Sequence, residues 1–374
     1  MVSKISFKNF KVFKSLQTLK LAPITVLIGK NNTGKSAVLR LPTMLASALN
    51  GEPLNWINKI GDDRENSIEL GSDFKDLVYN KVEAGIIELG IFNEKTSVEI
   101  AFTKEYGILD YKLNGENIDV NRVFKGLLID GESFENLTLN LDYLGAIRIE
   151  PESAYTFSNE DYDKIGIKGQ NAYLILVQDL KKNSTLINKV SNWYKENFEG
   201  WELDVLESKA KTETKYEISI SNSVIKGINI KQTGQGIHQV LPLIVLSYMS
   251  EKEPTLVIIE EPETHLHPAA HALLAQRFAE SYLENTNKQY LIETHSQNFV
   301  LRLRRMVAEG TLKPEDIAIY YVDFDERRNE SSLKEIEVDN GGGVKWWPEG
   351  IFSETAQETR AIYNAQINDL HHVD

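Results

Sequence analysis

The chain has 374 residues, of which 41% are hydrophobic, and its formal net charge is −14. A chain of this length can bury a large core and is expected to form one or two domains. It contains no cysteine, which excludes disulfides, thiolate metal sites and cysteine nucleophiles. No apolar run is long enough to span a bilayer, and the N-terminus is too polar for a secretory signal, so we expect a cytoplasmic protein that does not enter the membrane.

The first motif is an apolar strand over residues 24–28 followed by a phosphate-binding loop, Gly-Lys-Asn-Asn-Thr-Gly-Lys-Ser, and by helix-forming residues at 37–40. Glycines in such a loop let successive backbone N–H groups face phosphate oxygens, and the helix that opens near Gly34 adds its positive end. Lys35 then reaches the β- and γ-phosphates, and Ser36 ligates Mg²⁺. The motif predicts binding of ATP or GTP by Gly29, Lys30, Asn31, Asn32, Thr33, Gly34, Lys35, Ser36 and Ala37.

Charge is distributed unevenly around this loop. Residues 1–50 hold eight Lys or Arg and no acid, although the whole chain is acidic. Clustered cations suit nucleic-acid phosphates, so DNA is a possible partner. A solvated strand face beside an anion site explains the same pattern, and both interpretations stay open. The lysines concerned are Lys4, Lys8, Lys11 and Lys14.

The middle of the chain lacks these motifs, and we predict that residues 51–230 form an α+β insertion. It contains two strand-like stretches, one helical stretch and one hairpin-like stretch, at 85–91, 97–102, 172–198 and 216–230. No heptad repeat runs through it, which argues against a long coiled-coil arm. Alternating strands and helices return afterwards. We therefore assign 1–50 and 231–340 to one core and 341–374 to a C-terminal extension.

A second apolar strand, over residues 256–259, ends in the adjacent acids Glu260 and Glu261. Unpaired carboxylates at the tip of a buried strand are costly, whereas a magnesium nucleotide would use both of them. We assign Glu260 to Mg²⁺, through a water molecule, and Glu261 to the attacking water as catalytic base. Most strands of this Walker B type end in aspartate at the metal position, so the division of roles between the two acids stays open.

A third strand, over residues 289–293, leads into Thr294, His295 and Ser296, and Ser296 is a suitable cap for the helix that follows. A lone histidine is usually structural. Three motifs in this order instead favour a catalytic role for His295, whose neutral imidazole would donate a hydrogen bond to the γ-phosphate. The predicted catalytic residues are Glu261, His295 and Lys35.

Together these motifs resemble the ABC-type ATPase heads of the OLD-like and SMC-like families. Residues 5–13 resemble the first strand of those heads, and residues 260–268 resemble the Walker B motif and D-loop of OLD-like members. The resemblance implies an α/β P-loop NTPase fold, a mixed sheet flanked by helices, with the insertion lying between Walker A and the signature motif. Arg148 resembles a residue that OLD-like members place near the nucleotide, and an ordinary surface arginine is the alternative.

Residues 232–242 occupy the place of the signature motif, which in these families completes the nucleotide site of a second subunit. The resemblance therefore implies a head-to-tail homodimer that encloses two nucleotides. Which signature residue contacts the partner's nucleotide stays open, with Gly234 and Gly236 as the candidates. The implied cofactors are ATP and Mg²⁺.

The implied function is an ATP-hydrolysing molecular switch that dimerises on ATP and regulates an effector protein, such as a nuclease, in bacterial defence against phage or plasmid DNA. One alternative is a nucleotide-gated scaffold with little turnover. Another is that the chain is itself a DNA nuclease, because Asp323 and Asp325 follow the apolar run 317–322 in an Asp-x-Asp pattern. Only about 50 residues follow Asp325, too few for a separate nuclease domain.

Overall fold

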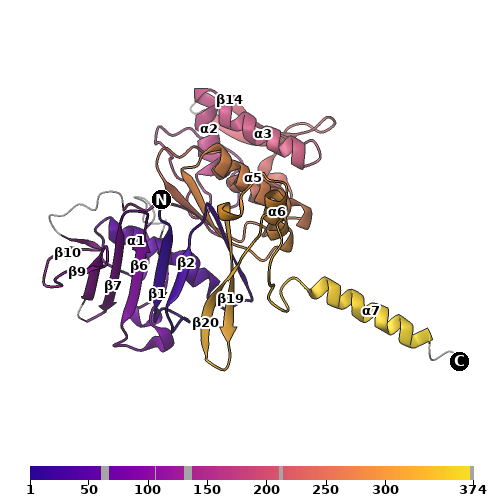
Figure 1. Cartoon of the computed structure of the whole chain (residues 1–374). Helices are drawn as coiled ribbons and strands as arrows, with labels where there is room; N and C mark the ends of the chain where they lie inside the picture. The colour runs from indigo at the N-terminus through magenta and orange to yellow at the C-terminus, as the bar shows by residue number, and fades with distance from the viewer. Residues whose placement is uncertain (60–66, 106, 130–136, 210–213, 371–374) are drawn as a thin grey trace.

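The computed structural model describes residues 1–59, 67–105, 107–129, 137–209 and 214–370. Parts of the predicted insertion and the last four residues of the predicted extension lie outside the described residues. Two six-stranded sheets lie side by side, with helices between and around them (Figure 1).

The central sheet has the strand order β12-β17-β18-β3-β19-β20. Adjacent strands are parallel from β12 to β19, and only β20 is antiparallel to its neighbour. All six residues of β3 are buried, as expected for a parallel strand whose sheet is covered on both faces. The strands are β12 (Asn140–Leu144), β17 (Thr255–Glu260), β18 (Lys288–Glu293), β3 (Ile24–Gly29), β19 (Ile317–Asp325) and β20 (Glu330–Ile336).

Helix α1 (Lys35–Leu49) covers one face of the central sheet and shares a hydrophobic core with the second sheet. That sheet is antiparallel throughout, in the order β2-β1-β6-β7-β8-β9. The first strand of the chain therefore pairs with residues 87–92 and not with the phosphate-loop strand. The strands are β2 (Gln17–Lys20), β1 (Lys4–Lys8), β6 (Ile87–Phe92), β7 (Ser97–Thr103), β8 (Gly107–Leu113) and β9 (Glu116–Asn117).

Five helices pack in a second core on the opposite face of the central sheet. They are α2 (Ala172–Lys182), α3 (Thr185–Asn197), α4 (Gln235–Tyr248), α5 (Pro268–Glu284) and α6 (Gln297–Ala308). The predicted helical stretch 172–198 is two helices, because Ser184 between them has a left-handed backbone, φ 56°. The Ser296 side chain accepts a hydrogen bond from Phe299 N, which confirms the predicted cap of α6.

Smaller elements complete the chain. Residues 216–230 do form a hairpin, because β15 pairs with β16 in antiparallel register. The small sheets contain β13 (Tyr155–Thr156), β14 (Glu202–Lys209), β15 (Thr214–Ser221) and β16 (Ile228–Asn229), then β4 (Ile57–Lys59) with β5 (Ser67–Glu69), and β10 (Phe124–Lys125) with β11 (Leu128–Ile129). Helix α7 (Glu354–Leu370) extends away from the rest of the molecule (Figure 1). Just before this helix, Trp347 and Phe352 pack against the core.

The structure shows how the predicted ranges contribute to this architecture. Strand β12, which lies within residues 51–230, pairs with β17 in the central sheet, so this sheet includes a strand from the predicted insertion. The domain boundaries themselves stay a prediction. In the part of the chain that the structure describes, no helix combines the length and apolarity needed to cross a bilayer.

Asp142 on β12 is a buried acid whose ionisation should weaken the fold. Its side chain is 1% exposed, and burial raises its pKa to about 7. Between pH 3.8 and 7 the folded chain therefore binds more protons than the unfolded chain, so the free energy of unfolding falls as pH rises through that window. Replacing Asp142 with Asn removes this penalty. We expect Asp142→Asn to stabilise the fold by about 1 to 2 kcal/mol at pH 8 and by less at pH 5.

Thermal unfolding of wild type and Asp142→Asn at both pH values checks this prediction. In the wild-type protein, Tyr143 N–H donates a hydrogen bond to Asp142 Oδ1 at 3.0 Å. Asparagine keeps a carbonyl oxygen that can accept the same bond. A gain of the same size at both pH values would show that ionisation of Asp142 is not the cause.

Candidate nucleotide site

The carboxyl ends of β3 and β18 meet the start of α1 at a hollow of about 650 Å³. Ligands in open α/β sheets bind at this edge. A larger hollow, about 1040 Å³, lies at the opposite ends of the strands, where Asn140 and Thr255 line it, and none of the predicted motifs reaches it. The first hollow is lined by Lys11, Val12, Asn31, Asn32, Gly34, Lys35, Ser36, Ala37, Arg40, Glu69, Leu70, Glu261, Glu293 and His295.

The phosphate loop has the backbone that its glycines permit. Gly29 has φ 155°, and a Cβ there would lie 2.5 Å from the carbonyl oxygen of Val322. Gly34 has φ 100°, and a Cβ there would lie 2.5 Å from the Val12 side chain. Either substitution would collide with its neighbours, so both positions require glycine.

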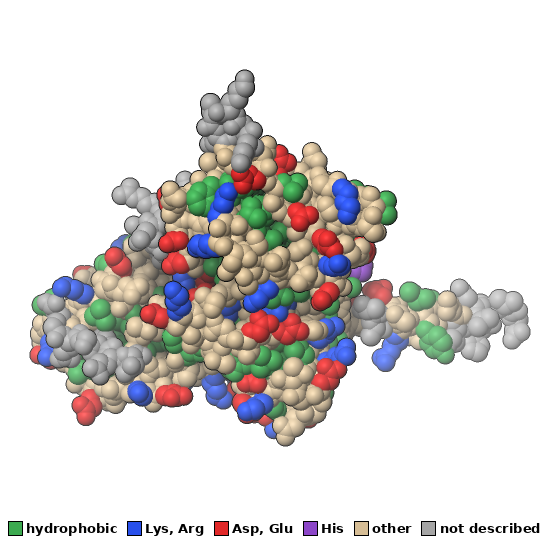
Figure 2. Space-filling model, turned by 90° about the horizontal axis from the view of Figure 1, so that it is seen from above, with side chains coloured by type: hydrophobic (Ala, Val, Ile, Leu, Met, Phe, Trp, Pro, Cys, Tyr) green, Lys and Arg blue, Asp and Glu red, His purple; other side chains and the backbone are tan. Residues whose placement is uncertain are grey.

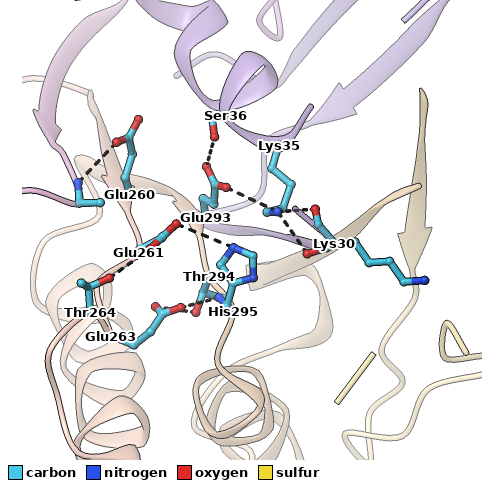
Figure 3. A network of polar contacts seen from close by, with 12 residues as sticks. Lys30, Lys35, Ser36, Glu260, Glu261, Glu263, Thr264, Glu293, Thr294 and His295 are labelled. Carbon is cyan, nitrogen blue, oxygen red and sulfur yellow. Dashed lines mark hydrogen bonds and ion pairs between the residues drawn. The ribbon is translucent and has the colours of Figure 1, made fainter. Parts of the chain in front are cut away.

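Lys35 lies inside this loop with its side chain 3% exposed. Its Nζ donates hydrogen bonds to the carbonyl oxygens of Gly29, at 3.1 Å, and Lys30, at 2.8 Å. The Lys30 side chain instead points away from the polar network (Figure 3). Thr33 closes the loop by donating its hydroxyl to the Lys30 carbonyl at 3.0 Å. Of the two lysines, Lys35 is therefore the one placed to meet phosphate oxygens.

The acid that contacts Ser36 is Glu293, at the end of β18. Ser36 Oγ donates a hydrogen bond to Glu293 Oε2 at 2.9 Å, and Lys35 Nζ lies 3.7 Å from Glu293 Oε1. Strand β18 pairs directly with β3, which brings its last residue next to the phosphate loop. No role for Glu293 was predicted from the sequence, although an acid at the tip of a buried strand was the signal that identified Glu260 and Glu261.

Glu260 lies one strand farther from the loop, because β18 separates β17 from β3. Its carboxylate accepts a hydrogen bond from Tyr143 Oη and forms an ion pair with Arg40 at 2.7 Å. Among the described residues, no hydrogen bond joins Glu260 to Ser36, whose hydroxyl donates to Glu293. The assignment of Glu260 to Mg²⁺ remains untested, and the geometry favours Glu293 for a direct role beside Ser36.

Glu261 and His295 lie next to each other in the hollow, with His295 Nε2 3.8 Å from Glu261 Oε1 (Figure 3). Glu263 holds the following strand end, since its carboxylate accepts hydrogen bonds from His295 N and Thr294 Oγ1. Burial lowers the pKa of His295, and Lys35 lowers it further, while Glu261 opposes the shift. The imidazole is therefore neutral at pH 7 and able to donate one hydrogen bond.

Three ligand atoms, one each from Glu261, Glu293 and His295, lie within 4.8 Å of one another. With the Ser36 hydroxyl, the two carboxylates of this set offer the hard oxygen donors that Mg²⁺ prefers, whereas His295 offers a nitrogen. Burial lowers the pKa of Lys35 and raises that of Glu293, and in both groups it outweighs their mutual attraction. The site thus holds two incompletely compensated charges, which a triphosphate with its cation would complement.

The signature candidates do not reach this hollow. Gly234 precedes the first residue of α4, and a Cβ on Gly236 would lie 3.2 Å from the carbonyl oxygen of His265. Neither glycine is among the described residues that line the hollow. Arg148 is only 4% exposed, so its interpretation as an ordinary surface arginine is wrong.

Most of the other polar candidates have partners within the chain. Lys8 pairs with Glu88 at 2.7 Å, and Lys4 lies over the Phe92 ring. Acidic and basic side chains are interspersed over the face seen in Figure 2. The two nuclease candidates are also engaged: Asp323 pairs with Lys334 at 2.6 Å, and Asp325 accepts hydrogen bonds from main-chain N–H groups.

Comparison with known proteins identifies the family. Residues 24–302 match a family described as "AAA domain, putative AbiEii toxin, Type IV TA system". Residues 312–362 match a second family, described as a protein of unknown function, DUF3696. The Old nuclease of Escherichia phage P2 is 24% identical over 80% of this chain. The chain spans only 57% of the length of that relative.

A solved SMC head, bound to the C-winged helix domain of ScpA, has a similar fold. The TM-score is 0.54 and the sequence identity 12%, over 90% of this chain and 98% of that chain. The mixed sheet flanked by helices is therefore that of an ABC-type P-loop ATPase head, as the motifs predicted. The chain belongs to the AAA-domain family that matches residues 24–302, and it has the fold of a P-loop ATPase head similar to those of OLD-like and SMC-like proteins.

Proposed function

We propose that this protein binds Mg²⁺-ATP and hydrolyses it to ADP and phosphate. The observation that carries the proposal is the convergence of Lys35, Ser36, Glu261, Glu293 and His295 on one hollow at the carboxyl edge of the sheet. An anion-binding loop, a lysine and a residue that orients the attacking water are recurring parts of enzymes that transfer phosphoryl groups to water, and the neutral imidazole of His295 adds a hydrogen-bond donor beside them.

Each side chain has a distinct role in the proposed reaction. The loop amides and Lys35 hold the β- and γ-phosphates, and His295 donates to a γ-phosphate oxygen. Glu261 orients the attacking water and accepts its proton. Ser36 and Glu293 would hold Mg²⁺, which, when bound, neutralises charge that develops on the phosphate oxygens. The nucleoside would extend into an adjoining hollow of about 750 Å³ that shares Lys11, Val12 and Asn32 with the first.

Steady-state release of phosphate from ATP, measured with calorimetric ATP affinity, tests this function. We expect binding in the presence of Mg²⁺ and turnover that depends on it. Tight binding with no turnover would instead support the alternative of a nucleotide-gated scaffold. Absence of binding would refute the nucleotide site itself.

The two acids proposed for the metal can be separated by matched substitutions. Glu293→Gln replaces the carboxylate beside Ser36 with a neutral amide. The Mg²⁺ concentration for half-maximal turnover should therefore rise about tenfold or more. Glu260→Gln should have a smaller effect, because Arg40 and Tyr143 already occupy that carboxylate. A Mg²⁺ titration of turnover measures both variants. The reverse order would restore Glu260 as the main metal partner.

We further propose that two copies assemble head to tail on ATP. The signature glycines, Gly234 and Gly236, lie outside the hollow of their own chain, so they are free to complete the site of another copy. Sedimentation with ATP and with ADP tests this step, and a mass independent of nucleotide would contradict it.

Regulation of an effector in bacterial defence rests on the likeness to OLD-like proteins alone. In this proposal the chain is a cytoplasmic switch whose ATP-bound dimer binds an effector protein, such as a nuclease, with DNA as a further possible partner. The nuclease named among its relatives leaves open that this chain cleaves DNA itself. Plasmid cleavage that is lost in Asp323→Ala or Asp325→Ala would support that alternative.

A further inference from the structure

Arg148 is a buried arginine that has no carboxylate within ion-pair distance among the described residues. Its Nη2 donates hydrogen bonds to the carbonyl oxygens of Glu260, at 3.3 Å, and Glu261, at 3.0 Å. Its Nε and Nη1 have no hydrogen-bond partner in the described part of the chain. Burying a guanidinium in this way is unfavourable for stability. Arginine at this position therefore calls for an explanation other than packing.

The two carbonyls belong to an unusual turn. Glu261 has a left-handed backbone, φ 40°, which residues with a side chain rarely adopt and which tends to occur at functional sites. Thr264 N donates to the Glu261 carbonyl at 3.2 Å, and Thr264 Oγ1 donates to Glu261 Oε2 at 3.2 Å. Arg148 adds a second donor to the same carbonyl. The direction of the Glu261 carboxylate thus depends on a turn that Arg148 contacts directly.

The main chain at Arg148 is itself held by hydrogen bonds to other segments. Its carbonyl accepts a hydrogen bond from Gln239 Nε2 of α4 at 3.4 Å, and the next residue, Ile149, donates its N–H to Lys168 O at 2.9 Å. Burial lowers the pKa of Arg148 to about 10, while Glu263 and Glu261 oppose the shift. The guanidinium therefore remains charged at neutral pH and is anchored on a fixed segment.

We propose that Arg148 is a positioning residue for ATP hydrolysis, which holds the carbonyls of Glu260 and Glu261 so that the Glu261 carboxylate faces the attacking water. The inference rests on the proposed function. Arg148 acts through Glu261 and not on the nucleotide. A displacement of about 1 Å in a catalytic group can cost up to about 100-fold in rate, so its removal should lower kcat and leave ATP affinity unchanged.

A double-mutant comparison on the full chain tests this role. Arg148→Met should lower kcat about 10- to 100-fold with ATP affinity within about twofold of wild type. Arg148→Lys, which keeps a charged donor, should recover part of the rate. In a Glu261→Gln background, Arg148→Met should cause no further loss, because both changes disable the same group. Arg277→Met is the matched control, since Arg277 on α5 is 3% exposed and lies outside the site.

Three results would overturn the proposal: unchanged kcat, a further loss in the Glu261→Gln background, or weaker ATP binding, which would mean that Arg148 contacts the nucleotide. If wild type shows no turnover, the proposed ATPase function is wrong, and the role of Arg148 in the turn is tested separately. Crystal structures of Arg148→Lys and Arg148→Met then decide whether Arg148 positions the turn. Glu261 leaving its left-handed conformation in either variant supports the proposal, and an unchanged turn in both refutes it.

Discussion

Replacing Glu261 with glutamine is expected to lower ATP turnover by about 10² to 10⁴ while ATP binding survives. Glutamine has nearly the same shape as glutamate but cannot accept the proton of the attacking water. The Glu261 carboxylate lies 3.8 Å from His295, whereas Lys35, the proposed phosphate ligand, donates to carbonyl oxygens of the phosphate loop. The substitution therefore removes the chemical step and leaves the groups that hold the nucleotide. Phosphate release measures the expected loss of turnover, and calorimetry on the same preparation measures the retained ATP binding.

Glu280→Gln is the matched control for this substitution. The Glu280 side chain is 39% exposed, against 40% for Glu261, and it pairs with Arg277 on α5. Its turnover should equal that of wild type. If Glu261→Gln turns over as fast as the control, Glu261 is not the base, and the neighbouring acids Glu260 and Glu293 become the candidates. Trapping of an ATP-bound dimer by Glu261→Gln would agree with hydrolysis as the step that releases the two copies.

Local patterns predicted the elements that build the site. Apolar runs bounded by glycine or acids predicted β3, β17 and β18, and the strands occur within one residue of the predicted bounds. The Ser296 cap was readable for the same reason, because capping depends on residues close together in the sequence. The glycines of the phosphate loop were predictable because their backbone angles and close contacts exclude other residues.

The order of the strands in the sheet could not be predicted from these local patterns. It depends on contacts between distant segments, and it decides which acid meets Ser36. Strand β18 lies between β17 and β3, so Glu293 contacts Ser36 and Glu260 does not. The same limit applies to Arg148, whose contacts with the carbonyls of Glu260 and Glu261 and with Gln239 of α4 join segments that are distant in the sequence. Long-range pairing also places the first strand in a sheet with residues 87–92.

Replacing Lys35 with methionine should weaken ATP binding about 10²-fold or more. Its ammonium would donate charge-assisted hydrogen bonds to the β- and γ-phosphates, and each such bond is worth about 1.5 to 3 kcal/mol. Methionine keeps the aliphatic volume but has no donor. Without the ammonium, the Glu293 carboxylate also faces the phosphates with less compensation, since Lys35 Nζ lies 3.7 Å from it. Calorimetric titration with a non-hydrolysable ATP analogue and Mg²⁺ measures the loss.

Lys288→Met separates loss of the site from loss of the fold. Lys288 is also a buried lysine, 1% exposed, and its Nζ donates to the carbonyls of Leu246 and Ser247, away from the phosphate loop. Its removal should leave the affinity of the folded protein for ATP intact, whereas Lys35→Met should lower that affinity, because the Lys35 ammonium lies inside the phosphate loop. Neither substitution should lower the melting temperature much, because burial lowers the pKa of both lysines and makes each a poor contributor to stability. Equal ATP affinity in wild type and Lys35→Met would mean that the loop does not hold a triphosphate, and the proposed ATPase would then lose its physical basis.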